Sequence, residues 1–464
     1  MAEGAKFLEG NLFKHITVMS FTASVGLIAI FLVDFVDMLF ISMLGKEELA
    51  AAIGYAGAIL FFTSSFGIGM AIACGAMVAK ALGAGDEQLA RERASTSLLW
   101  AIVFGSVFAA LVWFNIPALA RLMGASGATE ELATSYLRII IPSLPLLVIG
   151  MLGGAILRAY GDAKRSMAAT LAAGGVNAVL DPILIFGLDL ELTGAAIASV
   201  CARVAMAAMA LRPIIRHHGG FEPPSLRAMF RDFGPLAVIA FPAILTQLAT
   251  PIGQAYVTRS MAQFGEEAVA GMAIIGRLVP VSFAVLFALS GAIGPIIGQN
   301  YGAKQFDRVD RAFRDGMIFT ALIVGVVSLT LFFLREPIAA LFNAEGVARQ
   351  LLFLFCGPLA AAWFFNGVIF VTNASFNNLG HPFYSTWINW GRHTLGTIPF
   401  VILGAAWFGA PGVLIGQALG GAIFAAAALY LVLRVNRIAR EEDLEPAKPH
   451  ERQGRLHQLF NHRH

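Results

Sequence analysis

Four residues with the chemistry to bind a proton or a cation lie inside hydrophobic stretches of the sequence. Asn177 and Asp181 are four residues apart in the run 176–186, so on a helix both side chains would project from one face. Asp34 and Asp37 are three residues apart in an earlier run and would also share a face. An unpaired carboxylate in hydrocarbon costs roughly 3 kcal/mol or more, so these groups are expected to face a polar cavity or to hold a ligand.

This combination of groups suits either of two ions. Two neighbouring carboxylates raise each other's affinity for a proton, whereas carboxylate and amide oxygens together can hold a hard cation such as Na⁺. Pro182 lacks a backbone donor and should disturb the helix directly after Asp181. Two simpler explanations stay open: water could reach Asp181 at a helix end, and Asp34 could be a structural charge satisfied by a neighbouring helix.

Composition and hydrophobic runs indicate the fold that positions these groups. Of 464 residues, 58% are hydrophobic and 13% are charged, which no water-soluble globular domain would tolerate. We therefore predict an all-α membrane protein with twelve transmembrane helices. Prolines such as Pro142 and Pro358 predict bends in these helices. The expected spans are 16–43, 51–79, 94–116, 134–157, 166–188, 193–212, 236–259, 268–298, 315–334, 350–374, 383–408 and 412–434.

The sequence gives no support to an enzyme or a cofactor-binding protein. Cys74, Cys201 and Cys356 lie in apolar segments without the spacing of metal ligands or of a disulfide framework. We find no nucleophile elbow, His-Glu metal signature or phosphate loop, so we expect no enzymatic activity and no cofactor. We also expect no nucleic-acid partner, and the lipid bilayer is the predicted surrounding.

Basic residues are distributed unevenly over the expected loops, which predicts the orientation of the chain. The N-terminus, the even-numbered loops and the tail carry most of the lysines and arginines. The odd-numbered loops carry only Lys46, Arg121, Arg259, Arg335 and Arg349. By the positive-inside rule, both termini and the stretch 212–233 are predicted to be cytoplasmic.

The two halves of the sequence resemble each other. The segments 75–80 and 82–84 correspond to 294–299 and 301–303, whereas Asp181 corresponds to Ile398, which is not acidic. Two lobes of six helices, related by an axis along the membrane normal, are a common architecture for alternating access. The predicted units are an N-terminal lobe, 1–212, a cytoplasmic linker, 213–235, a C-terminal lobe, 236–434, and a disordered cytoplasmic tail, 435–464.

A cavity between two such lobes needs a lining that can adapt to its substrate. Aromatic rings and methionines can provide it, although most of them face lipid or pack between helices. For Arg203, Arg277, Arg392 and His393, which are costly inside a membrane, we expect structural pairing or snorkelling. The candidate cavity residues are Met19, Phe62, Phe66, Met70, Gln254, Phe287, Trp363 and Trp390.

Several motifs in order resemble the MATE (multidrug and toxic compound extrusion) family, and in particular its DinF-like bacterial branch. The resemblance covers essentially the whole chain, including the repeat. It rests on Val36-Asp37-Met38-Leu39-Phe40-Ile41-Ser42-Met43-Leu44-Gly45, on Leu82-Gly83-Ala84-Gly85-Asp86, on Leu157-Arg158-Ala159-Tyr160-Gly161-Asp162, and on Asn177 with Asp181-Pro182.

The resemblance implies an antiporter, coupled to H⁺ or Na⁺, that exports organic and often cationic drugs or toxic compounds across a bacterial inner membrane. In the DinF-like branch the ion binds at positions that match Asp37, Asn177, Asp181 and Ser199, with Ser199 in place of the more usual threonine. Asp37, Asn177 and Asp181 would hold Na⁺ if that is the ion, and Asp34 is a further candidate. Small organic molecules are the expected partners, and we expect a monomer.

A flippase for lipid-linked oligosaccharides, which is similar to this family in fold, is the alternative function. Such a protein would need a strongly cationic cavity with a groove that faces lipid. Arg277 and Arg392 are the residues that leave this alternative open.

Overall fold

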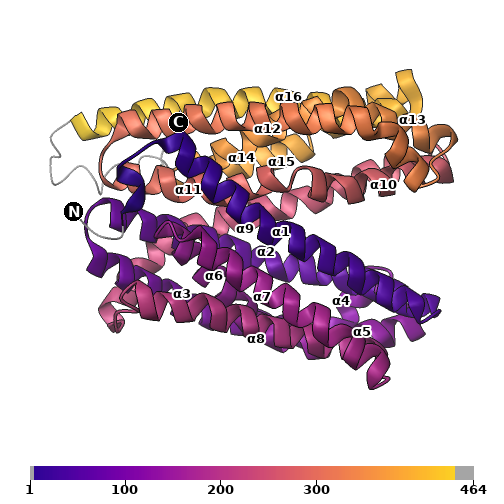
Figure 1. Ribbon diagram of the computed structural model, residues 1–464, viewed down its shortest axis with the longest axis horizontal. Helices are drawn as coiled ribbons and strands as arrows, with labels where there is room; N and C mark the ends of the chain where they lie inside the picture. Colours follow the sequence, from indigo (N-terminus) through magenta and orange to yellow (C-terminus); the bar gives the residue numbers. More distant parts are fainter. Residues whose placement is uncertain (1–4, 445–464) are drawn as a thin grey trace, which may run out of the picture.

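The computed structural model describes residues 5–444, and within that range it contains only helices, turns and short connections (Figure 1). The expected disordered tail, 435–464, begins as helix as far as Leu444, and the rest of that prediction lies outside the described residues. The expected linker, 213–235, is mostly helical too, since only 218–225 separate two long helices.

The first half of the chain forms one bundle, drawn from indigo to magenta in Figure 1. Several of its helices begin at side-chain caps: Asp86 and Asp162 each accept a hydrogen bond from the backbone N–H three residues later. The helices are α1 (Leu12–Met43), α2 (Glu47–Gly83), α3 (Glu87–Phe114), α4 (Ile116–Leu122), α5 (Ala128–Ile140), α6 (Leu144–Ala159), α7 (Ala163–Pro182) and α8 (Glu191–His217).

The second half forms the other bundle, drawn from rose to yellow, and starts at a similar cap, Ser225. Its helices are α9 (Leu226–Ala262), α10 (Glu266–Ser282), α11 (Ala284–Gly302), α12 (Phe306–Leu341), α13 (Gly346–Leu354), α14 (Ala360–Asn378), α15 (Pro382–His393) and α16 (Ile398–Leu444). Figure 1 shows the two bundles lying side by side with their helices nearly parallel to the long axis.

Eleven of the described helical segments are long and apolar enough to cross a membrane. The expected span 383–408 is not among them, because it is divided into α15 and the first part of α16. Thr394 leaves the helical conformation after α15, and Gly409 takes a φ of 65° and a ψ of −143° inside α16. Counting this broken segment, the arrangement fits the predicted twelve-helix fold.

Two prolines bend corresponding helices of the two lobes. Pro142 lies in a short 3₁₀ turn, Ile141–Ser143, between α5 and α6. Pro358 lies in a π-helical turn, Phe355–Leu359, between α13 and α14. Both interruptions follow from the missing backbone donor of proline, as the sequence predicted.

Two long helices cross from one lobe to the other. At its start, α1 packs with the C-terminal lobe, where Ile16 and Met19 share a hydrophobic core with Phe283. Its later part packs on α7, so the helix runs diagonally over the boundary in Figure 1. The counterpart α9 does the reverse, because Leu236 and Ala240 belong to the core of the N-terminal lobe. The first helix of each lobe therefore also packs in the core of the other lobe.

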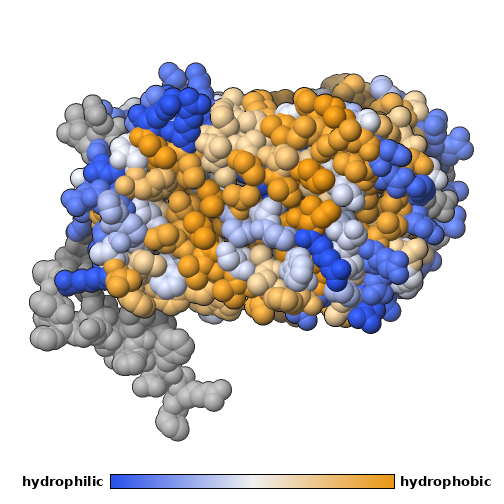
Figure 2. Space-filling view, turned by 90° about the horizontal axis from the view of Figure 1, so that it is seen from below, coloured by the Kyte–Doolittle hydropathy of each residue, from blue (hydrophilic) through white to orange (hydrophobic). Residues whose placement is uncertain are grey.

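The outer surface has the polarity expected of a membrane protein. Figure 2 shows a hydrophobic band across the middle of one face and hydrophilic residues gathered towards both ends. Large apolar side chains such as Phe114, Phe333 and Trp407 are more than 70% exposed, which is typical of lipid contact.

The lobes meet tightly at the end of the bundle where α2 and α11 terminate. Gly83 lies directly against the backbone of Gln299, and Gly302 lies against the backbone of Lys80. Gln299 also donates to the carbonyl of Ala159 (2.7 Å) and accepts from the backbone N–H of Phe7 (2.8 Å). We call this contact the interlobe seal. Gly83 corresponds to Gly302 in the sequence repeat, and Lys80 corresponds to Gln299, so the two halves of the contact are nearly symmetric.

Candidate functional site

The predicted acidic residues meet at the boundary between α1, α7 and α8. The side-chain amide of Asn177 donates from Nδ2 to Oδ2 of Asp37 (2.7 Å) and to Oδ2 of Asp181 (2.9 Å). Asp181 is 1% exposed and Asn177 is 8% exposed, so both are buried in the lobe. The i,i+4 spacing on α7 puts the amide directly beside one carboxylate, and the bond to α1 joins the two helices.

The acidic cluster has unused binding capacity. Oδ1 of Asp37, of Asn177 and of Asp181 are all buried and accept no hydrogen bond within the described chain. Because both carboxyl groups bind the same Asn177 amide, their charges lie close together and repel each other unless a proton or a cation is bound. Buried oxygens are rarely left without a partner, so this arrangement suits a proton or a small cation.

The backbone after Asp181 departs from a regular helix, as expected from the presence of Pro182. After Pro182 the chain widens into a π-helical turn, Ile183–Gly187, before α8 begins. Such turns are common at functional sites. Gly194 of α8 packs against the backbone of Leu184, which holds this turn close to α8.

Tyr136 belongs to the same neighbourhood and was missed by the sequence analysis. Ser199, Asp37, Asp181 and Arg203 are its electrostatic neighbours. A lone tyrosine in an apolar span carries no spacing signal, so only the packing of α5 on α8 could show this. Ser199 therefore adjoins the cluster through Tyr136.

The remaining charged candidates lie in different surroundings. Asp34 is exposed and has no side-chain hydrogen bond among the described residues, so it is only an electrostatic neighbour of Asp37. Arg203 donates to the carbonyl of Ile140 (3.1 Å) and to Ser143 (2.9 Å), which is the structural pairing expected for it. Arg277 is exposed on α10.

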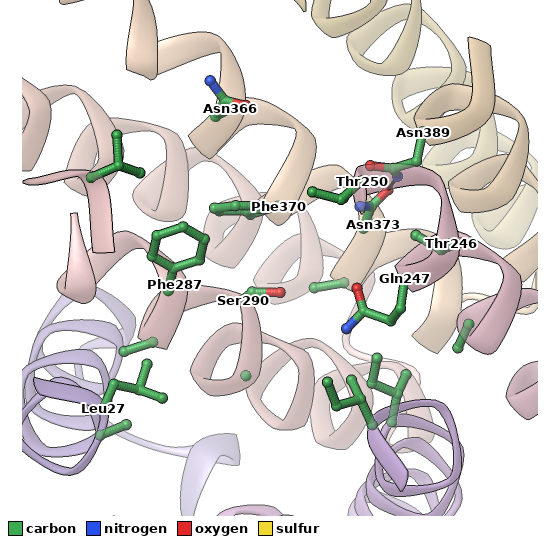
Figure 3. Close-up of a pocket in the computed structure, with 18 of the residues that line it drawn as sticks. Leu27, Thr246, Gln247, Thr250, Phe287, Ser290, Asn366, Phe370, Asn373 and Asn389 are labelled. Carbon is green, nitrogen blue, oxygen red and sulfur yellow. Dashed lines mark hydrogen bonds between the residues drawn. The ribbon is translucent and has the colours of Figure 1, made fainter. Parts of the chain in front are cut away.

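A cavity of about 940 Å³ separates the two lobes and does not include the acidic cluster in its lining. Figure 3 shows its polar wall, formed by Thr246, Gln247 and Thr250 of α9, Asn366 and Asn373 of α14, and Asn389 of α15; Leu27 of α1 stands apart from that wall. Polar residues thus gather on the side of the C-terminal lobe, whereas Leu27, Ile30 and Phe31 give α1 an apolar surface.

Of the eight expected cavity residues, Gln254, Phe287 and Trp363 line this cavity. The others face different neighbours because periodicity does not tell which face of a helix meets the cavity. Met19 and Met70 are buried in the lobe cores. Phe62 and Phe66 pack on Phe108, and Trp390 donates to the backbone carbonyl of Leu245 (2.9 Å).

Comparison with known proteins gives two matches to one family model. The model described as MatE matches residues 23–183 and again 242–403, one copy in each lobe. The chain belongs to the MatE family. This confirms the resemblance that the sequence motifs carried, and it places the chain among membrane transporters and not among enzymes.

Individual relatives of this MATE protein span nearly its whole length. It is 30% identical over 427 residues to a protein named FAD transporter from Shewanella oneidensis, covering 90% of this chain and 93% of that one. It is 23% identical to the multidrug export protein MepA of Staphylococcus aureus, covering 92% and 94%. A crystal structure of MATE in complex with MaL6 superposes with a TM-score of 0.87 at 23% identity, covering 95% of this chain and 100% of that one.

Proposed function

We propose that this MATE protein is an antiporter that exports a small organic compound in exchange for H⁺ or Na⁺. The observation that carries the proposal is the acidic cluster. Asp37 and Asp181 share the Asn177 amide, and three oxygens of these residues are buried with no hydrogen-bond donor within residues 5–444 as described. A site of this kind is stable only when a proton or a cation offsets its charge.

The position of the cluster suggests how the ion could act on the substrate cavity. Asp37 lies on α1, whose Leu27 and Phe31 line the cavity and whose Ile16 packs in the other lobe. Loading the ion removes charge repulsion between α1 and α7, and this changes the preferred packing of α1. The two access states then differ in ion affinity, which is the requirement for exchange.

The names of relatives suggest two classes of cargo. MepA is named for the export of multiple drugs, and the Shewanella relative is named for FAD. A cavity of about 940 Å³ lies at the upper end of the range for drug-sized ligands. We propose a cargo of this size, including the organic drugs that the family resemblance implied.

We further propose that both termini are cytoplasmic in a bacterial inner membrane, as the charge distribution predicted. The interlobe seal then closes the cytoplasmic end. Opening this seal while the opposite end closes would be the rocking step of alternating access. A monomer contains all the residues of the cluster and of the cavity.

The flippase alternative keeps partial support. Of the two arginines that left it open, Arg392 lines the cavity, whereas Arg277 lies outside the lining.

The proposed function is tested in proteoliposomes loaded with ethidium or with a flavin. An imposed H⁺ or Na⁺ gradient should drive export against the concentration gradient of the substrate, and only the coupling ion should do so. Transport that is unaffected by either gradient would contradict the antiport mechanism.

A further inference from the structure

The charged groups that line the central cavity are all basic. Arg158 of α6 and Arg392 of α15 line it, together with His393, and no aspartate or glutamate is among the described lining residues. Arg158 is held by Ser166 (2.9 Å) and lies against Gly291 of the opposite lobe. The cavity therefore has a positive potential that nothing in its own wall neutralises.

Arg392 is a buried cation that has no carboxylate partner among the described residues. It is 8% exposed, and its Nη1 donates to Oδ1 of Asn366 (2.8 Å) while Nη2 donates to Oδ1 of Asn389 (3.2 Å). Nη2 also lies 3.0 Å from Nε2 of His393. These partners are neutral, and the buried Nε of Arg392 has no acceptor in the part of the chain that the structure describes. Burial of a guanidinium without a counter-charge is costly, so a bound anion would stabilise this arrangement.

An aromatic wall lies on the same helical stripe as the partner of Arg392. Trp363, Asn366, Phe370 and Asn373 follow one another at three- and four-residue spacing on α14, and all four line the cavity. Phe287 of α11 contacts both rings, with centroid distances of 5.8 Å to Trp363 and 5.4 Å to Phe370. Edge-on and tilted rings of this kind suit a flat aromatic ligand.

From the basic lining and this wall together, we propose that the cavity carries an organic anion. Arg392, oriented by Asn366 and Asn389, binds the phosphate or carboxylate group, and Phe287, Trp363 and Phe370 cover the aromatic part. A cationic drug would meet two like charges and no carboxylate in the same place. The inference refines the substrate class of the antiporter proposed above and rests on that function.

Riboflavin and FMN provide a matched pair of probes, because they share one ring system and differ by a phosphate ester. Binding is measured by equilibrium dialysis with the full-length protein in nanodiscs, without any ion gradient. FMN should bind at least about tenfold more tightly than riboflavin, since a hydrogen bond to a charged group commonly contributes that much. Arg392→Gln should weaken FMN binding about tenfold to a hundredfold and leave riboflavin binding nearly unchanged.

Three further variants guard against trivial explanations. Arg277→Gln removes an exposed arginine outside the lining and should leave FMN binding unchanged. Arg392→Lys keeps the charge and should retain part of the FMN preference. If Arg392→Gln fails to fold, Arg158→Gln tests the same electrostatic requirement and should also weaken FMN binding selectively. Equal affinity for FMN and riboflavin, or equal losses for both in Arg392→Gln, would overturn the proposal.

Two additional measurements separate this inference from the proposed function and identify the source of the anion. Wild-type protein that prefers FMN but shows no gradient-driven transport would support the anion site and contradict antiport. Gradient-driven export of ethidium without a preference for FMN would contradict the anion site and leave antiport intact. Undecaprenyl phosphate added to the nanodisc distinguishes a lipid-linked anion from a water-soluble one, and displacement of FMN by this lipid would still support the anion site.

Discussion

Adding a single methyl group at the interlobe seal should shift the protein between its two access states. In Gly83→Ala, the new Cβ would overlap the carbonyl oxygen of Gln299, which is backbone and cannot rotate away. Overpacking of this kind costs about 1–3 kcal/mol. The cost falls mainly on the state in which α2 and α11 touch, because separation of the two helices relieves it. We expect the opening equilibrium at this end to rise about fivefold to a hundredfold.

Hydrogen exchange in nanodiscs measures this shift directly. Amides in 80–84 and 299–303 should exchange faster in Gly83→Ala by the same factor, because exchange in native proteins reports local opening. Gly302→Ala should behave alike, since its Cβ would overlap the carbonyl of Lys80 in the symmetric contact. Gly57→Ala is the matched control on the same helix, as nothing lies within 4 Å of the methyl position. Exchange in Gly83→Ala that matches this control would refute the role of the seal.

Three further predictions concern the loops and the surroundings of the cluster. Burial raises the pKa of the Asp162 carboxyl, but hydrogen bonds from His218 (3.0 Å) and Arg165 outweigh burial and hold it below its usual value. Asp162→Asn should thus lower the free energy of unfolding at pH 7 by about 1 kcal/mol, because the helix cap is weaker and the ion pair is lost. The difference from the wild-type protein should shrink below about pH 4, where the carboxylate of the unfolded chain takes up its proton. A difference in thermal stability that does not depend on pH would contradict this assignment. Ser199→Ala should reduce gradient-driven efflux only in part, because one neutral oxygen beside Tyr136 is lost while the carboxylates remain; wild-type or zero efflux would contradict it. A cysteine at Glu222 should react with an impermeant reagent in inside-out vesicles and not in intact cells, and the reverse pattern would overturn the proposed orientation.

Much of the fold could be predicted from the sequence because a bilayer imposes simple requirements. Each long apolar run must form a helix to satisfy its backbone, and Pro142 and Pro358 must interrupt theirs. The break after α15 has a different origin. Gly420 of α16 packs directly on the backbone of Gly396 in the break, a contact between distant segments that local spacing cannot show.

Functional residues could be predicted where a polar or charged group is costly to bury in the membrane. Prediction was weaker where a residue's role depends only on which face of its helix meets the cavity. Asn177 and Asp181 stood out because hydrocarbon does not tolerate them unpaired, and the structure joins them to Asp37. Asp34 carries the same cost, but among the described residues it has no side-chain hydrogen bond that would join it to the cluster. Phe62 and Phe287 are equally plausible as cavity residues by type, and only the packing of their helices separates them.

The coupling carboxylates are the central claim, and replacing each by its neutral isostere tests them most directly. Asp37→Asn and Asp181→Asn each remove a charge from a buried site while keeping its shape, so both proteins should fold and insert normally. In proteoliposomes with the gradient that drives the wild-type protein, both variants should lose gradient-driven efflux. Asp34→Asn should retain most of it, because Asp34 is exposed and is not hydrogen-bonded to the cluster. Efflux against a gradient at the wild-type rate by well-folded Asp37→Asn and Asp181→Asn proteins would contradict the assignment.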